Sequence, residues 1–227
     1  MTRQLTLALP LQEAQGRADF LVAPSNERAL AALDAWADWP ARKAVLVAPE
    51  GAGKSHLARV WATSAGAAVV QAIDLPHADL PALATAGVAV EDADRAPGLA
   101  TETALFHLHN LLAERRLPLL VTARTPPRDW GLGLPDLASR MQAAPVIRLD
   151  PPDDTLLRAV MVKQFTDRQI AVAPQVIDFL IPRMTRSLAA AREIVSALDA
   201  RALAEGRPVT RQMAAEWFEG PGLFDLD

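Results

Sequence analysis

The chain has 227 residues, 51% of them hydrophobic, which allows one large domain or a medium domain with a small satellite and argues against global disorder. It contains no cysteine, which excludes disulfides, thiolate metal sites and a cysteine nucleophile, and fits a cytoplasmic protein. The net charge of -4 argues against a free-standing DNA-binding protein, and no apolar run approaches a signal peptide or the roughly 18 residues of a membrane span.

A flexible tail is expected over residues 1–15, followed by a first helix. Ser25 is a candidate cap for a helix over residues 26–39, where Leu30, Leu33 and Trp36 recur at helical spacing. This helix precedes the first of the alternating strands and helices.

Short apolar runs then alternate with helical segments. Strands are predicted at residues 44–47, 67–71, 88–90, 119–122 and 146–149. Helices are predicted over 54–64 and 101–114. Such alternation is typical of parallel βαβ units, and strands that are apolar throughout indicate helices on both faces of the sheet. The predicted fold class is therefore α/β, with a five-stranded parallel sheet between helices.

Only helices are predicted beyond Asp150. The breaker at 151–154 is followed by helical segments at 155–168, 174–184, 188–205 and 210–218. We therefore expect a domain boundary near residue 150, with an α/β nucleotide-binding domain over 16–150 and a small all-α lid domain over 151–227.

The segment 48–55, Ala-Pro-Glu-Gly-Ala-Gly-Lys-Ser, has the spacing of a Walker A phosphate loop, with Ala48 where the strict pattern has glycine. It follows a predicted strand and precedes a predicted helix. Its glycines let the backbone wrap closely around phosphates, and the helix that follows points its positive end at them. A chance glycine loop is the alternative. The predicted nucleotide-binding residues here are Gly51, Ala52, Gly53, Lys54, Ser55 and His56.

Three of these residues have distinct expected roles. Lys54 is expected to reach the β- and γ-phosphate oxygens, and the Ser55 hydroxyl is expected to bind Mg²⁺. His56 directly follows the loop and has packing within the helix as its alternative role. The segment thus predicts a site for ADP or ATP with Mg²⁺.

Two acidic residues follow the strand predicted at 88–90. A phosphate loop needs a carboxylate at the end of a neighbouring strand to hold Mg²⁺ and to position water. Glu91 is assigned to Mg²⁺ and Asp92 to the attacking water. This order reverses the common Asp-Glu order, which leaves open whether the chain hydrolyses its own nucleotide. An acidic turn at a strand end is the alternative interpretation.

Together these segments resemble the AAA+ core of the DnaA/Hda family over nearly the whole chain. Residues 20–26, Phe-Leu-Val-Ala-Pro-Ser-Asn, are similar to the family segment that cups adenine, and Asn26 matches its asparagine. Residues 119–127 resemble the sensor I strand, with Thr122 at the polar sensor position. The resemblance implies that Asn26 binds nucleotide and that Thr122 takes part in catalysis.

Two arginines gain roles from the same resemblance. Residues 135–141 are similar to the arginine-finger box, with Arg140 as the finger that acts on the neighbouring subunit's nucleotide. Arg186 stands at the start of a sensor II helix and is expected to touch the nucleotide from the lid. A surface arginine is the alternative for Arg140, and Arg183 or Arg192 is the alternative lid sensor.

The short Hda-type members are the most similar. Nine residues follow Phe218 (227 minus 218), too few for a helix-turn-helix domain, so no direct sequence-specific DNA binding is expected. The N-terminal tail resembles their clamp-binding peptide, in which a glutamine amide and apolar side chains fill a groove. The predicted contacts with the sliding clamp of DNA polymerase III are Gln4, Leu5, Leu7 and Leu9, with a frayed apolar terminus as the alternative.

The resemblance implies a cytoplasmic regulator with two protein partners, DnaA and the sliding clamp. Such a protein promotes hydrolysis of DnaA-bound ATP through Arg140 and so prevents re-initiation of DNA replication. No membrane association is expected, and a homo-oligomer is left open. The alternatives are an autonomous ATPase of the helicase-loader type acting on single-stranded DNA, and a scaffold whose nucleotide only stabilises the fold.

Overall fold

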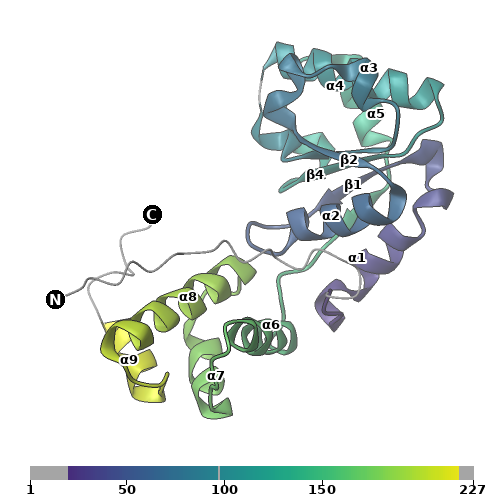
Figure 1. Cartoon of the computed structure of the whole chain (residues 1–227). Coiled ribbons are helices and arrows are strands. Elements are labelled where there is room, and N and C mark those ends of the chain that lie inside the picture. The colour runs from purple at the N-terminus through teal and green to yellow at the C-terminus, as the bar shows by residue number, and fades with distance from the viewer. Residues whose placement is uncertain (1–19, 97, 220–227) are drawn as a thin grey trace.

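The computed structural model describes residues 20–96 and 98–219. An α/β part lies beside a smaller helical part that begins with α6 (Asp154–Asp167), as Figure 1 shows. The predicted domain boundary near residue 150 falls in the connection before α6. The predicted clamp-binding residues Gln4, Leu5, Leu7 and Leu9 lie outside the described residues.

The sheet has five strands in the order β2-β3-β4-β1-β5, and every neighbouring pair is parallel. The strands are β1 (Lys43–Val47), β2 (Ala68–Gln71), β3 (Val88–Glu91), β4 (Leu119–Ala123) and β5 (Val146–Arg148). The predicted five-stranded parallel sheet is confirmed. Because β1, β3 and β4 are neighbours and run the same way, the segments that follow them meet at one edge of the sheet.

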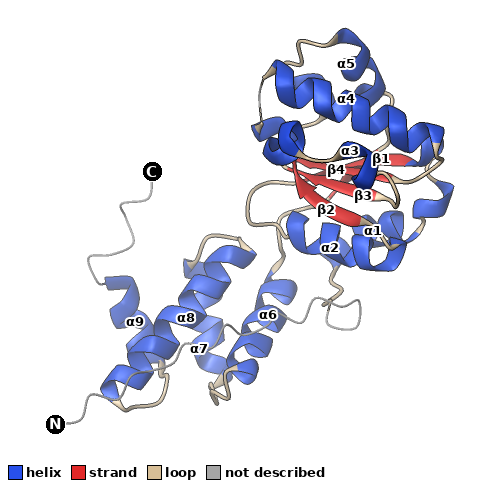
Figure 2. Cartoon of the chain, turned by 45° about the horizontal axis from the view of Figure 1, so that its top comes forward, coloured by secondary structure: helices blue, strands red, loops and turns tan. Residues whose placement is uncertain are grey.

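Helices cover both faces of the sheet, as Figure 2 shows. One face packs against α1 (Pro24–Asp34) and α2 (Lys54–Ala65), and the other against α4 (Leu99–Glu114) and α5 (Pro135–Gln142). The central strands β1, β3 and β4 are buried, apart from a half-buried Lys43 at the start of β1, because their side chains alternate between these two cores. The edge strands are not apolar throughout: β2 alternates between half-buried and exposed residues, and β5 buries only Ile147.

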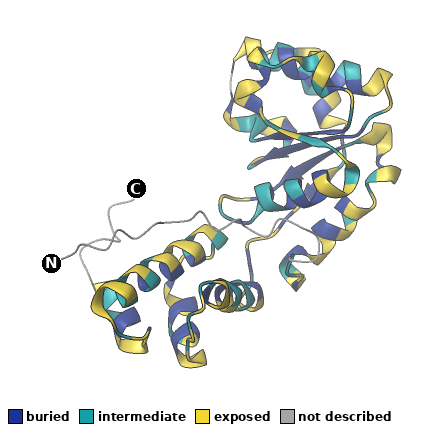
Figure 3. Ribbon diagram, viewed as in Figure 1, coloured by how far each residue is buried: buried dark blue, intermediate teal, exposed yellow. Residues whose placement is uncertain are grey.

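The helical part has its own apolar core. It consists of α6, α7 (Pro174–Leu180), α8 (Leu188–Glu205) and α9 (Arg211–Glu219), packed around side chains that include Met161 and Phe165. Figure 3 shows buried residues on the inner sides of these helices and exposed residues outside. No helix in the described part of the chain is long and apolar enough to cross a membrane.

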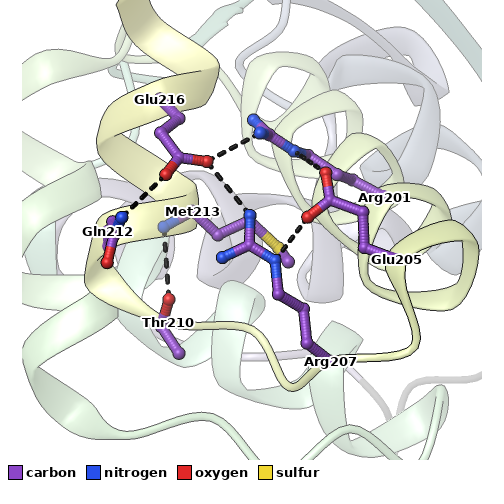
Figure 4. Close-up of polar contacts among 7 residues, drawn as sticks. All are labelled: Arg201, Glu205, Arg207, Thr210, Gln212, Met213 and Glu216. Atoms are coloured by element: carbon purple, nitrogen blue, oxygen red, sulfur yellow. Dashed lines mark hydrogen bonds and ion pairs between the residues drawn. The ribbon is translucent and has the colours of Figure 1, made fainter.

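An ion-pair network joins the last two helices of this part (Figure 4). Arg201 on α8 binds Glu205 at 2.7 Å and Glu216 on α9 at 2.6 Å, and Arg207 contacts the same two carboxylates. All four side chains are about one-third exposed. Because exposed ion pairs contribute little to stability, the shared apolar core of α8 and α9 holds these helices together and the network adds little.

Several predicted helix ends differ from the structure. The first helix begins at Pro24 rather than Asn26, and its N-cap is Ala23 rather than Ser25, because the Asn26 side chain accepts a hydrogen bond from the Ala23 backbone N–H at 2.9 Å. It ends at Asp34. Short 3₁₀ helices, Trp36–Asp38 and Pro40–Arg42, follow in place of its predicted last turn.

Prolines account for other differences. The helix predicted over 174–184 ends at Leu180 and continues as a 3₁₀ turn, Ile181–Arg183, in which Pro182 has no N–H to extend the α-helix. The sequence analysis did not predict the 3₁₀ helix Ala72–His77, α3 (Leu80–Leu83) or α5. Each contains a proline, which is read as a breaker. In α3 and α5 the proline lies in the first turn, where it is well tolerated, whereas Pro76 lies inside the 3₁₀ helix.

Candidate nucleotide-binding site

A cavity of about 740 Å³ lies where the loop after β1 and the segments after β3 and β4 face helices α6 and α8. Its lining includes seven basic side chains but only three acidic ones, which favours an anionic ligand. The basic residues are Lys54, Arg59, Arg95, Arg124, Lys163, Arg168 and Arg192. The acidic residues are Glu50, Asp92 and Asp167.

The loop between β1 and α2 forms one wall of the cavity. Gly51 and Gly53 have φ values of +72° and +102°, in the left-handed region that favours glycine, and α2 begins immediately at Lys54. The loop therefore turns tightly onto a helix N-terminus, as the phosphate-loop prediction requires. All six predicted nucleotide-binding residues from Gly51 to His56 line the cavity.

Lys54 is buried, with 7% of its surface exposed. Its ammonium group donates hydrogen bonds to the carbonyl oxygens of Ala48 at 3.1 Å and Pro49 at 3.4 Å, and so lies within the curl of the loop. Burial lowers the pKa of Lys54 from its usual 10.5, while the nearby carboxylate of Asp92 acts in the opposite direction. An ammonium group that the protein solvates only in part is a strong site for a phosphate oxygen.

The lid part directly contacts this loop. The backbone N–H of Leu188, the first residue of α8, donates to the Gly51 carbonyl oxygen at 2.8 Å. A Cβ atom on Gly51 would lie 2.1 Å from the Ser187 hydroxyl oxygen. The close approach of α8 to the phosphate loop therefore depends on glycine at position 51.

The predicted acidic residues occupy different places. Asp92 lines the cavity, and its backbone N–H donates to the Thr122 hydroxyl at 3.1 Å, so the predicted sensor threonine supports the turn that carries Asp92. Glu91 is buried and is not part of the lining; one of its oxygens accepts from Gln71 at 2.7 Å, and the other has no partner. The structure thus brings Asp92 and Thr122 together and places Glu91 behind them.

These positions can be tested against the needs of Mg²⁺. No cluster of three or more histidine, aspartate or glutamate side chains suited to a metal ion occurs within residues 20–96 and 98–219. Magnesium in nucleotide sites needs only one or two protein ligands, because phosphates and water complete its coordination. The Ser55 hydroxyl and the Asp92 carboxylate, both in the lining, fit this requirement. Glu91, next to Asp92 in the chain, has a buried oxygen without a hydrogen-bond partner and is a further candidate acceptor.

Part of the cavity lining is apolar or aromatic. The rings of Phe20 and His56 stack at 5.4 Å, and side chains that include Leu156 and Val160 line the same cavity. Asn26 is buried here; besides its bond from Ala23, its amide donates to the Leu21 carbonyl oxygen at 2.9 Å. Asn26 therefore holds the segment that carries Phe20 in place through its bonds to Leu21 and Ala23. The stacked Phe20 and His56 rings offer a surface for a flat base.

The two predicted arginines lie outside the lining. Arg186 pairs with Asp154 at 2.9 Å, whereas Arg192, the alternative lid sensor on α8, lines the cavity. Arg183, the other alternative, lies over the ring of Phe179.

Arg140 lies near the end of the sheet at which β1 begins. It is exposed on α5, with its guanidinium 5.2 Å from the centre of the Phe106 ring. Its charge contributes, after burial, to lowering the pKa of Lys43, the first residue of β1. Since the phosphate loop follows the last residue of β1, Arg140 and the cavity belong to opposite ends of that strand.

The charged residues beside Thr122 carry no motif and were not predicted as part of the site. Arg124, immediately after β4, lines the cavity and forms an ion pair with Glu50 of the loop at 2.7 Å. The backbone N–H groups of Arg124 and Thr125 donate to Asp94 at 2.8 and 3.0 Å. The position of Arg124 could have indicated its role, because it directly follows β4, which pairs with β1, the strand before the phosphate loop. Residues that follow such strands lie at the ligand-binding end of a parallel sheet.

Solved structures of known proteins share this architecture, although no protein-family model matches the sequence. Domain III of the replication initiation protein DnaA from Thermotoga maritima is 19% identical, with a TM-score of 0.76 over 93% of this chain and 98% of that chain. AMPPCP-bound DnaA from Aquifex aeolicus is 15% identical, with a TM-score of 0.67 over 83% and 66%.

A branch-migration motor gives a third match. The RuvB protein of Thermotoga maritima is 15% identical, with a TM-score of 0.62 over 78% of this chain and 61% of that chain. These TM-scores establish a shared fold, and at identities this low the fold is all that they establish. The chain therefore has the P-loop AAA+ fold that is seen in DnaA domain III.

Proposed function

We propose that this chain binds an adenine nucleotide with Mg²⁺ and regulates a DnaA-type initiator, rather than working mainly as a stand-alone ATPase. The observation that carries the proposal is the separation of two features. The chain's phosphate loop lines a basic cavity, whereas its exposed Arg140 lies toward the opposite end of the same sheet. An arginine in that place is available to a neighbouring molecule and not to the chain's own cavity.

The proposed nucleotide site uses the two ends of the cavity differently. The backbone of Gly51 and Gly53 and the Lys54 ammonium would hold the phosphates. Ser55 and, in place of the predicted Glu91, Asp92 would hold Mg²⁺, which neutralises phosphate charge. The base would lie near the stacked Phe20 and His56. Two of the similar DnaA structures contain AMPPCP, which supports an adenine nucleotide as the ligand.

The lid side of the site would use Arg192. It is the one of the three candidate lid arginines that lines the cavity, so we propose it, in place of Arg186, as the residue that senses phosphate from α8. Arg186 instead would help to fix the lid through Asp154.

Arg140 would act on nucleotide bound by the partner. A guanidinium placed beside a transferring phosphoryl group neutralises the charge that develops there, and its planar geometry suits phosphate better than an ammonium group does. The Phe106 ring would hold the guanidinium in position before docking. The chain would thus convert ATP-bound DnaA into its ADP form.

The N-terminal segment would supply the second partner. We propose that Gln4, Leu5, Leu7 and Leu9 bind the sliding clamp of DNA polymerase III, which would restrict the activity to the cytoplasmic replication machinery after clamp loading. These residues lie outside the described part of the chain, so this proposal depends on the sequence pattern.

A reconstituted hydrolysis assay tests the proposal. ATP-bound DnaA, clamp-loaded DNA and the wild-type chain should together give rapid ATP hydrolysis, and Arg140→Ala should reduce the stimulation on the order of a thousandfold. Gln4→Ala should abolish capture of the chain by the clamp in a pull-down. It should lower the stimulation in reactions that depend on clamp-loaded DNA to bring the chain and DnaA together. Undiminished stimulation by Arg140→Ala would disprove the finger assignment. Hydrolysis by the chain alone that rises with single-stranded DNA would favour the helicase-loader alternative.

A further inference from the structure

Arg124 has a firmly held backbone. It is the first residue after β4 and lies two positions beyond Thr122. Its backbone N–H and that of Thr125 both donate to one oxygen of Asp94, at 2.8 and 3.0 Å. Asp94 belongs to the turn that follows Asp92, so the segments after β3 and β4 are tied together at the base of the Arg124 side chain.

The guanidinium group of Arg124 lies at the phosphate end of the cavity. Its Nη2 atom is 2.7 Å from Oε2 of Glu50, which belongs to the phosphate loop. Arg124 lines the same cavity as Lys54, and its charge is among the causes, after burial, that lower the pKa of Lys54. The two cations therefore face the same cavity, and each lies beside the phosphate loop.

The partner of Arg124 is weakly held. The Glu50 side chain is 72% exposed, whereas that of Arg124 is 32% exposed. An exposed ion pair contributes little, because water solvates both groups well when they separate. A phosphate presents more charge and more acceptor oxygens than a carboxylate, and the arginine fork can bind it through two hydrogen bonds. A terminal phosphate can therefore displace Glu50 from its ion pair with Arg124.

We propose that Arg124 distinguishes ATP from ADP in this chain's own site, by leaving Glu50 for the terminal phosphate of ATP and keeping Glu50 when the ligand is ADP. The inference rests on the proposed nucleotide binding and adds the residue that reads the nucleotide state. It also gives Glu50 a role, as a competing anion that lowers the affinity for ATP relative to ADP. Removal of the two side chains should thus change the preference in opposite directions.

Isothermal titration with ATP and with ADP, each with Mg²⁺, measures the preference as a ratio of dissociation constants. Arg124→Gln should weaken ATP binding about tenfold, because charge-assisted hydrogen bonds are lost, and should change ADP binding less than about twofold. Glu50→Gln should raise the preference for ATP by about twofold to threefold, because the competing charge is removed. In the Arg124→Gln background, Glu50→Gln should leave the preference unchanged.

Arg128→Gln is the matched control for loss of positive charge. Arg128 lies four residues beyond Arg124 on the same segment, is 75% exposed, pairs with Asp129 and is not part of the cavity lining. This variant should keep the wild-type preference. Thermal unfolding without nucleotide checks that each variant is folded, and Arg124→Lys, which keeps the charge without the planar fork, should show an intermediate preference.

The outcomes separate the inference from the proposed function. If the wild-type chain binds neither nucleotide, both fall. If ADP and ATP bind but Arg124→Gln weakens them equally, the nucleotide site stands and the discrimination by Arg124 is wrong. An unchanged or reduced ATP preference in the folded Glu50→Gln variant would also overturn it, even if Arg124→Gln failed to fold.

Discussion

The two ends of the parallel sheet carry positive charge in different ways. Where β1 ends, Lys54 and Arg124 face into a cavity that also contains Glu50 and Asp92. Where β1 begins, the charge of Arg140 contributes, after burial, to lowering the pKa of Lys43, and the charges of Lys43 and Arg140 contribute, after burial, to lowering the pKa of His109. The first group encloses a space for a ligand, whereas Arg140 in the second group is exposed on a helix surface.

The difference fits the proposal that one fold serves two nucleotides. Glycines and a helix N-terminus allow the first end to surround phosphates with backbone N–H groups. The second end presents Arg140 on the exposed surface of α5, with its guanidinium over the Phe106 ring. We interpret the first end as the chain's own site and the second as the surface offered to a partner's site.

Replacing Lys54 should produce the largest effect and tests the cavity end. Lys54→Ala should weaken ATP and ADP binding at least about 100-fold, because the buried ammonium group is lost from the phosphate loop. Lys43→Ala removes a half-buried lysine from the other end of the same strand and should leave both affinities unchanged. Isothermal titration measures both variants. Equal losses in the two would contradict the division of the molecule into two functional ends.

Closure of the cavity by α8 is tested at Gly51. Gly51→Ala should lower the free energy of unfolding by about 2–4 kcal/mol, through left-handed backbone strain and the clash with Ser187. Gly66→Ala is the control, because its φ of +62° gives similar strain but nothing lies within 4 Å of its Cβ. Urea unfolding compares them. Equal losses would mean that α8 does not press on the loop.

The end of the sheet at which β1 begins should make the free energy of unfolding depend on pH. Burial, with the charge of Lys43 second, lowers the pKa of His109 from 6.5. The Lys43 ammonium lies 3.2 Å from its Nε2 atom, which can accept that contact only when His109 is neutral. The unfolded chain therefore binds a proton below pH 6.5 that the folded chain does not. This stability is fully present above pH 6.5 and is lost as the pH falls toward the folded pKa, by at most about 1.4 kcal/mol per pH unit.

Urea unfolding between pH 7.5 and 5.5 measures this slope. His109→Gln should flatten it, because the variant has no group at that position to protonate. His107→Gln, on the exposed side of the same helix, is the matched control and should keep the wild-type slope. Similar slopes in wild type and His109→Gln would show that this end of the sheet is not sensitive to protonation.

The smallest effect is expected at Arg140. Arg140→Ala should change the chain's own ATP and ADP affinities less than about twofold and its unfolding free energy by less than about 1 kcal/mol, the value of an exposed contact with an aromatic ring. Titration and urea unfolding measure both. A tenfold loss of nucleotide affinity would place Arg140 in the chain's own site and remove the basis for its action on a partner.

Local signals made much of the fold predictable. The apolar runs of the strands and the glycines before Lys54 placed the sheet and the phosphate loop, and α8 begins and ends at the predicted residues. Proline-containing helices and the partial exposure of the edge strands were less predictable, because a proline reads as a breaker and an edge strand is covered on one side only. Sequence spacing could not choose between Arg186 and Arg192, since their difference depends on how α8 lies over the loop.

By itself, the sequence determined the elements of this protein and the residue types of a phosphate-binding loop, because strand periodicity and glycine conformation are local properties. Only the tertiary structure decided which charges meet. The strand order brings Arg124 to Glu50 and Thr122 to Asp92, places Glu91 behind the cavity and leaves Arg140 toward the far edge. Such pairings join residues far apart in the chain, so they follow from the packing of strands and helices and not from spacing along the sequence.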